Sequence, residues 1–82
     1  MVVITGNNMG RVVRYHRKRL GWTQMGLAKE AGVGKTMIFD LENGKKTVKM
    51  ETLLKVLGAL HIRLVGNSPY MESYEDQQRE EA

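Results

Sequence analysis

The sequence predicts a small all-α fold of four to five helices, followed by one short β-strand near the C-terminus. Three observations lead to this fold class. Apolar residues recur at the helical period of 3.6 residues in several segments. Glycines and an Asn-Gly pair divide these segments into short lengths that suit single helices. The chain has 82 residues, which is enough for one compact domain with a modest core.

The first helix is predicted to begin near residue 9 and to stop at Gly21. Its apolar face consists of residues at i, i+3, i+4, i+7 and i+11, namely Met9, Val12, Val13, His16 and Leu20. The opposite face carries Arg11, Arg14, Arg17, Lys18 and Arg19. Before this helix, residues 2–5 form a β-branched run suited to a brief strand. Asn7 or Asn8 is then available to cap the helix.

A short second helix is predicted over the sequence QMGLAKEA, with Thr23 as its N-cap. Gly32 follows this segment and suits the left-handed residue that ends many helices. A third helix is predicted from about Lys35 to Asn43, where Asn43-Gly44 is a strong stop. Ile38 and Leu41 are three residues apart, so they can share its buried side.

The C-terminal part is predicted to hold a basic loop, a fourth helix and a strand. The helix begins between residues 48 and 50, and its apolar positions are Met50, Leu53, Leu54, Leu57 and Leu60. The sequence HIRLVG then alternates as a short strand does. Residues 1–66 are therefore expected to form the folded domain, and the polar, acidic residues 67–82 a disordered tail.

The sign of the net charge also changes at the boundary between residues 66 and 67. Residues 1–66 carry twelve Lys and Arg against four Asp and Glu, a net charge of +8, whereas residues 67–82 carry a net charge of −4. A basic body predicts a polyanionic partner, although a solvated surface that is merely basic explains the same charges. Paired carboxylates, a nucleophile-base set and cysteines are missing from the sequence, and the two histidines lie far apart. Neither an enzyme, a metal nor a cofactor is therefore expected.

The sequence GVGKTM, residues 32–37, has the Gly-Lys-Thr order of a phosphate-binding loop. That loop needs a further glycine five residues before Gly34, and the residue there is Lys29. The segment in front is also helical in its pattern and not a strand. Two short helices joined by a tight turn instead form a helix-turn-helix. Ala28 is small where the two helices cross, and Gly32 makes the turn.

The stretch RKRLGWTQMGLAKEAGVGKTMIFDLENGKK resembles the lambda-repressor/Cro-like (XRE) helix-turn-helix family. The specific parts are TQxxLAxxAGV and IxxLExGK, and the resemblance covers roughly residues 9–61. It implies a compact lambda-repressor-like DNA-binding domain that lies on the major groove with its third helix. It also implies an ion pair between Arg17 and Glu42. The sequence departs from the family at Gly34, where a Ser or Thr commonly caps the third helix.

The resemblance implies base contacts from the third helix, at Lys35, Thr36, Phe39 and Asp40. Lys35 can reach guanine acceptors, Thr36 can serve either hydrogen-bond role and Phe39 can pack on a thymine methyl. Burial of Phe39 against a helix or a partner chain remains open. Asp40 is repelled by phosphates unless it accepts from a cytosine, and a solvated or intramolecular role is an equal alternative. Phosphate contacts are implied at Thr23, Gln24, Asn43, Lys45, Lys46 and Lys49; for Gln24 the alternative is an ordinary first residue of a helix.

The C-terminal pattern resembles the HipB-type antitoxins. That resemblance implies a homodimer held by a strand containing Ile62, Leu64 and Val65, since a lone strand would leave its edges unpaired. It also implies a palindromic double-stranded operator, a kinase-like toxin as partner and a place in the bacterial cytoplasm, at the nucleoid. No run approaches the length of a membrane span. A stand-alone phage-like or chromosomal repressor is the first alternative, and a protein- or RNA-interaction module is a remote one.

Overall fold

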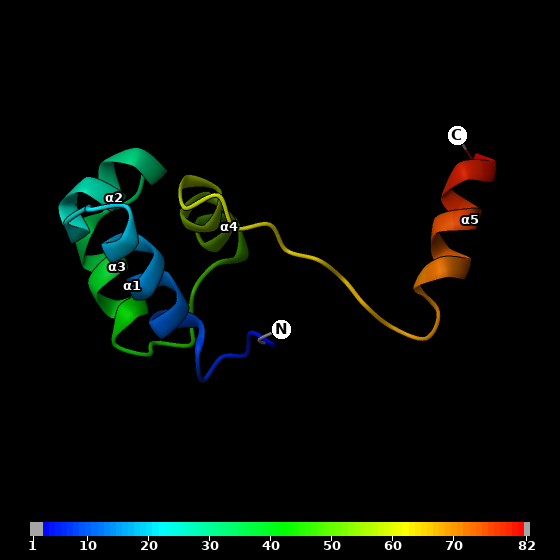
Figure 1. Ribbon diagram of the computed structural model, residues 1–82, viewed down its shortest axis with the longest axis horizontal. Coiled ribbons are helices and arrows are strands. Elements are labelled where there is room, and N and C mark those ends of the chain that lie inside the picture. Colours follow the sequence, from blue (N-terminus) through cyan, green and yellow to red (C-terminus); the bar gives the residue numbers. More distant parts are fainter. Residues whose placement is uncertain (1–2, 82) are drawn as a thin grey trace.

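The computed structural model describes residues 3–81 and contains five α-helices in this part of the chain (Figure 1). Four of them form one body, and the fifth stands apart at the end of an extended segment. The elements are α1 (Met9–Arg19), α2 (Gln24–Ala31), α3 (Lys35–Glu42), α4 (Met50–Ala59) and α5 (Met71–Glu81). The predicted all-α class is confirmed, and α2 has the predicted bounds.

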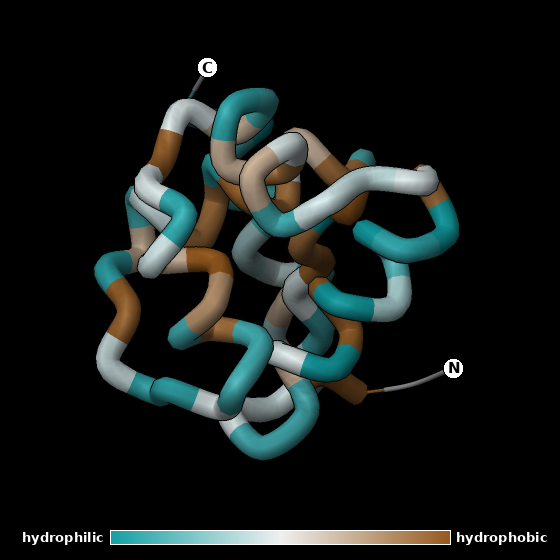
Figure 2. The backbone as a smooth tube through the Cα atoms, turned by 90° about the vertical axis from the view of Figure 1, so that its left-hand side faces the viewer, coloured by the Kyte–Doolittle hydropathy of each residue, from teal (hydrophilic) through white to brown (hydrophobic). Residues whose placement is uncertain are grey.

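The core lies where α2 packs on α3 and α4, and where α1 packs on α3. Apolar stretches from several helices meet in the middle of the body, as the brown segments of Figure 2 show. Ala28 is buried, in agreement with the small residue expected at the helix crossing. The buried apolar residues are Val13, Leu27, Ala28, Ala31, Ile38, Leu41, Val56, Leu57 and Leu60.

The turn between α2 and α3 has the expected local chemistry. Thr23 caps α2, and its Oγ1 accepts a hydrogen bond of 2.9 Å from the amide of Gly26. Gly32 has a φ of 72°, and the amide of Val33 then donates to the carbonyl of Ala28. This left-handed ending satisfies helix carbonyls that would otherwise be unpaired. Recognition of the turn from sequence is thereby confirmed.

Two predicted apolar faces differ from the observed ones. Leu20 and Leu54 are exposed, and so is Met50, whereas Val56 is fully buried. Since α4 packs chiefly on α2, its buried face is turned toward Val56 and Leu60 and away from Leu54. Arg17 is buried, although it shares the basic side of α1 in the sequence pattern.

The predicted strands are wrong for a single chain. Among residues 3–81 no β-strand forms, and residues 62–68 are extended without a ladder partner. His61 has a φ of 60° and ends α4 instead of opening a strand, because the amide of Ile62 donates to the carbonyl of Leu57. Val2, the first residue of the expected N-terminal strand, lies outside the described residues.

The start of the chain is tied to α1 by side chains in place of a strand partner. Asn8 occupies the N-cap position, yet its side chain makes no cap hydrogen bond. Its Oδ1 accepts from the amide of Thr5 at 2.7 Å, and its Nδ2 donates to the carbonyl of Val3 at 2.9 Å. The amide of Thr5 and the carbonyl of Val3 are therefore already hydrogen-bonded to Asn8.

The acidic tail is helical and not disordered over residues 71–81. Within α5, Gln77 and Gln78 each donate to Glu81, and Arg79 pairs with Asp76. Such i,i+3 and i,i+4 pairs stabilise a helix locally. The expectation of disorder rested on amino-acid composition, which does not take this spacing into account. None of the described side chains of α5 is buried.

Candidate nucleic-acid interface

The N-terminal ends of α2 and α3 lie together on one exposed face. Gln24 opens α2, Lys35 and Thr36 open α3, and Phe39 follows one turn later. These four side chains line one shallow pocket of ≈ 370 Å³. Lys35 and Thr36 are exposed, and Phe39 is 53% exposed. Burial of Phe39 within a single chain is therefore excluded, and all four side chains are accessible to a ligand.

A buried ion pair between Arg17 and Glu42 connects the elements that form this face. The Arg17 Nε lies 2.7 Å from the Glu42 Oε2, and Arg17 Nη2 donates to Oε1 at 2.9 Å. The hydrogen bond to Glu42 raises the pKa of Arg17 above its ordinary value, against the opposing effect of burial. Arg17 also donates to the carbonyl of Trp22 at 2.8 Å. The pair thus joins α1, the loop before α2, and α3.

Glu42 also holds the side chain of Gln24. The Gln24 Nε2 donates to the Glu42 Oε1 at 3.2 Å. This contact links a buried pair to a partly exposed amide at the start of α2. The Gln24 side chain is consequently more than an ordinary first residue of a helix, since a buried carboxylate restricts its rotamers.

Asp40 and Lys45 are paired within the chain. The Lys45 Nζ lies 3.6 Å from the Asp40 Oδ2, and both side chains are partly exposed. This contact supplies the intramolecular role that the sequence left open for Asp40. It leaves Lys35 and Thr36 as the polar side chains at the exposed end of α3.

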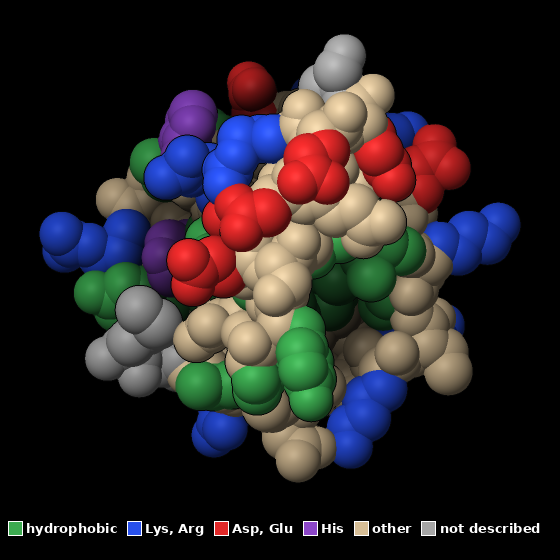
Figure 3. All heavy atoms as spheres, turned by 90° about the vertical axis from the view of Figure 1, so that its right-hand side faces the viewer, with side chains coloured by type: hydrophobic (Ala, Val, Ile, Leu, Met, Phe, Trp, Pro, Cys, Tyr) green, Lys and Arg blue, Asp and Glu red, His purple; other side chains and the backbone are tan. Residues whose placement is uncertain are grey.

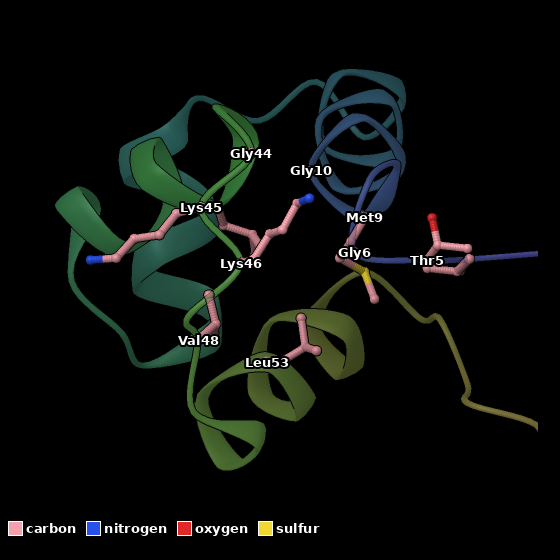
Figure 4. A pocket seen from close by; sticks show the side chains of 11 residues that line it. Thr5, Gly6, Met9, Gly10, Gly44, Lys45, Lys46, Val48 and Leu53 are labelled. Carbon is pink, nitrogen blue, oxygen red and sulfur yellow. The ribbon is translucent and has the colours of Figure 1, made fainter.

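The remaining predicted phosphate-contact residues follow α3 along the chain. The Asn43 Nδ2 donates to the carbonyl of Phe39 at 2.9 Å, which secures the end of α3. Figure 4 shows a second pocket, which lies between the start of α1, the loop after α3 and Leu53 of α4. Lys45 points away from this pocket, and Lys46 points toward the start of α1. Lys49 is exposed and lies at the N-cap position of α4. The basic loop therefore spreads its charges and does not gather them at one point.

Sequence reasoning missed Arg14 at this interface. Arg14 is exposed and lines a polar pocket of ≈ 240 Å³ together with Gln24 and Asn43. The floor of this pocket includes Arg17 and Glu42. A signal was present, because Arg14 precedes Arg17 by three residues and so lies on the same side of a helix.

The predicted dimerisation residues lie apart from this face in one chain. Ile62 is partly buried and packs against the core, whereas Leu64 and Val65 are exposed. The three therefore do not form one apolar surface within the chain.

Within residues 3–81, no three His, Asp or Glu side chains come together as a metal site would require. No helix in this part of the chain has the length and apolar character of a membrane span.

A helix-turn-helix whose second helix exposes its N-terminal residues defines a class of DNA-binding domains. Residues 13–66 match the helix-turn-helix family HTH_3. The chain belongs to this family, and within it to the XRE type.

Known proteins with similar sequences or folds agree with this class. A stretch of 39 residues is 49% identical to the competence pilus inhibition repressor of Acinetobacter baylyi and spans 48% of this chain, but only 36% of that repressor. Among solved structures, a HipB–O1–O2 complex superposes with a TM-score of 0.73 at 24% identity, covering 83% of this chain and 99% of HipB. A HipA–HipB–O2–O3 complex gives a TM-score of 0.74 at 23% identity, covering 84% and 97%. At such identities the likeness establishes the fold.

Proposed function

We propose that this chain is a transcriptional repressor that binds a palindromic operator as a homodimer. The observation that carries the proposal is the shared exposed pocket of Gln24, Lys35, Thr36 and Phe39 at the tips of α2 and α3. Lys35 and Thr36 offer hydrogen-bonding groups to base edges, and Phe39 offers an apolar contact to a thymine methyl. Gln24 and the amides at the start of α2 suit a phosphate oxygen.

Phosphate contacts complete the proposed interface. Thr23, Asn43, Lys45, Lys46 and Lys49 flank the same helices, and Arg14 joins them through the polar pocket that it shares with Asn43. Such contacts set the position of the protein on the duplex and the salt dependence of affinity. Asp40 acts in this arrangement by holding Lys45, and a direct contact to a base is secondary. This interface belongs to a domain of residues 1–66, with residues 67–82 as its acidic tail.

The proposed dimer pairs the segment of Ile62, Leu64 and Val65 across a two-fold axis. Leu64 and Val65 are exposed in the single chain, and the backbone of residues 63–66 has unused hydrogen-bonding groups. A symmetric dimer uses both and presents two α3 helices to the half-sites of a palindrome.

We further propose that the repressor is the antitoxin of a HipBA-like pair, with a kinase-like toxin as partner. The likeness in fold to HipB, which has been solved in a HipA–HipB–O2–O3 complex, supports this role. A stand-alone repressor is the second candidate, and the identity to the competence pilus inhibition repressor favours it. Purification of the tagged chain from its native host separates them, since only an antitoxin brings a stoichiometric kinase-like protein with it.

Base reading is tested with duplexes selected from a random pool. We expect Lys35→Ala and Thr36→Ala to weaken binding to the selected sequence by about ten- to a hundredfold, because one good base contact contributes about 1–3 kcal/mol. Binding to unrelated duplex should fall much less. Lys29→Ala, at the far end of α2, serves as the control. An equal loss on both duplexes would remove Lys35 and Thr36 from the base-reading role.

A further inference from the structure

The helix α5 has an apolar side, and it stands apart from the four helices of the body (Figure 1). Within this side only Met71 is partly buried, where it lies against Gly66 of the preceding segment. Met71 and Tyr74 lie on one side of α5 by helical spacing, and Tyr70 directly precedes it, one turn before Tyr74. Glu72, Asp76 and Glu80 lie on the other side. Tyr70 and Tyr74 are 78% and 55% exposed. An isolated helix of this length is marginal in water. Its apolar side therefore requires a surface to pack against.

An apolar groove of ≈ 580 Å³ lies along the outer side of α1. Its apolar lining comes from Ile4, Val12, Tyr15 and Ile62, and Tyr15 is 62% exposed. Arg11 stands in the same groove and is exposed. The polar residues Asn8 and His16 also line the groove, whose surface is mainly apolar with one exposed cation at Arg11.

The apolar side of α5 and the groove along α1 are complementary in apolar character and in charge. Two tyrosines and a methionine match the size and apolar character of the groove, and aromatic side chains contribute most strongly when they become buried. Glu75 lies next to Tyr74 and within a turn of Met71, so it can face Arg11 when these side chains enter the groove. Figure 3 views the molecule from the α5 end and shows Asp and Glu side chains gathered there, above a group of hydrophobic side chains.

The path of the chain points to a groove on a second copy. Ile62 belongs to the groove, and residues 62–68 then lead away from it in extended form, which separates α5 from its own body (Figure 1). Seven extended residues span up to about 23–25 Å. In a two-fold dimer that is joined near residues 62–66, each arm begins at the interface and can cross to the partner.

We propose that two copies exchange their C-terminal arms, with α5 of one copy packed in the α1 groove of the other. Tyr70, Met71 and Tyr74 enter the groove, and Glu75 pairs with Arg11. The exchange is reciprocal, so it closes at two copies. This inference rests on the proposed homodimer and adds a second contact to it, separate from the α3 face.

The absence of cysteine from the sequence allows a direct test by crosslinking. Arg19 lies one turn beyond Tyr15 on the same side of α1, and Gln78 lies one turn beyond Tyr74 on α5. Two differently tagged chains, one with Arg19→Cys and one with Gln78→Cys, are mixed and treated with a flexible bismaleimide. We expect a crosslinked pair that contains both tags. The control chain carries Lys55→Cys on α4 in place of Arg19→Cys and should crosslink far less.

Two other results would overturn arm exchange. A crosslink formed only within a chain that carries both Arg19→Cys and Gln78→Cys would place α5 on its own body. Preferential crosslinking of Gln78→Cys to Thr36→Cys would place the acidic helix on the α3 face instead.

Sedimentation separates a failure of this inference from a failure of the dimer. We expect Met71→Ala and Tyr74→Ala each to raise the dimer dissociation constant about tenfold, and Ser73→Ala to leave it unchanged. Alanine favours helices, so the loss reports the contact and not the helix. A dimer that is insensitive to both changes contradicts arm exchange alone. A chain that is monomeric at all concentrations contradicts the homodimer and the exchange together.

Discussion

Gly10 shows how one residue position controls the approach of two helices. A Cβ built on Gly10 would overlap the carbonyl oxygen of Leu41, which is a backbone atom of α3. Backbone of a packed helix cannot move as a flexible side chain does. The crossing of α1 and α3 therefore depends on the missing side chain, although the sequence pattern gives Gly10 no special role.

We expect Gly10→Ala to lower the free energy of unfolding by about 1–3 kcal/mol or more, as overpacking of a core does. Gly58→Ala is the matched control, because a Cβ at Gly58 meets nothing within 4 Å. Alanine should stabilise that exposed position of α4 by up to about 1 kcal/mol. Urea unfolding of both variants measures the difference. Equal effects would contradict the close approach.

The two ion pairs of α3 differ in burial, and their contributions should differ accordingly. Side-chain exposure is 10% for Arg17 and 3% for Glu42, but 53% for Lys45 and 33% for Asp40. Glu42→Ala leaves a buried cation unpaired, which typically costs about 3–5 kcal/mol. Asp40→Ala should cost at most about 1 kcal/mol. Similar urea midpoints for the two variants would show that the Arg17 pair is not essential to the fold.

The two central helices begin with different caps. Thr23 caps α2 with its side chain, whereas Gly34 at the N-cap of α3 has no side chain to offer. A Cβ at Gly34 would meet no atom within 4 Å, and its φ of −76° suits any residue. The absence of a Ser or Thr at this position is therefore not required by space or by backbone geometry.

We expect Thr23→Ala to lower the free energy of unfolding by about 1 kcal/mol, and Gly34→Ser to raise it by a few tenths of a kcal/mol. Thermal unfolding of the two variants beside the parent chain checks both signs. If Gly34→Ser destabilises the chain, a serine hydroxyl does not reach the amides at the start of α3.

Prediction of elements from sequence succeeded where the signals are local. The extent of α2 follows from a capping Thr23 and a left-handed Gly32, both of which act within a few residues. The buried side of α4 does not follow from its own sequence, because Leu54 and Val56 are equally apolar. Packing against α2 selects Val56 for the core and leaves Leu54 exposed.

At the scale of the whole molecule, charge should govern non-specific affinity for DNA. The basic body and the acidic tail carry opposite net charges, and the exposed Lys45 lies on the loop that follows α3. Each phosphate contact contributes about 0.9 to the slope of log affinity against log salt concentration.

We expect Lys45→Ala to weaken binding to every duplex and to reduce the magnitude of that slope by about 0.9. Lys29→Ala removes the same charge from the C-terminal turn of α2 and should leave the slope nearly unchanged. Fluorescence anisotropy over a series of salt concentrations measures both. A slope for Lys45→Ala equal to that of the parent chain would exclude a phosphate contact at this residue.

The sequence by itself determined the class of fold, the helix-turn-helix and the Arg17–Glu42 pair, which came through the resemblance to a known family. The fold class and the helix-turn-helix depend on short-range spacing, caps and turns, which lie within a few neighbouring residues. The Arg17–Glu42 pair joins residues that are 25 positions apart, so only the resemblance to the family predicted it. Only the tertiary structure decided that Glu42 also holds Gln24, that Asp40 pairs with Lys45 and that Arg14 joins the polar pocket. It also decided that residues 62–68 stay extended and that α5 is a helix with an unburied apolar side. Such features depend on which surfaces meet, and contacts between distant residues leave no periodic trace in the sequence.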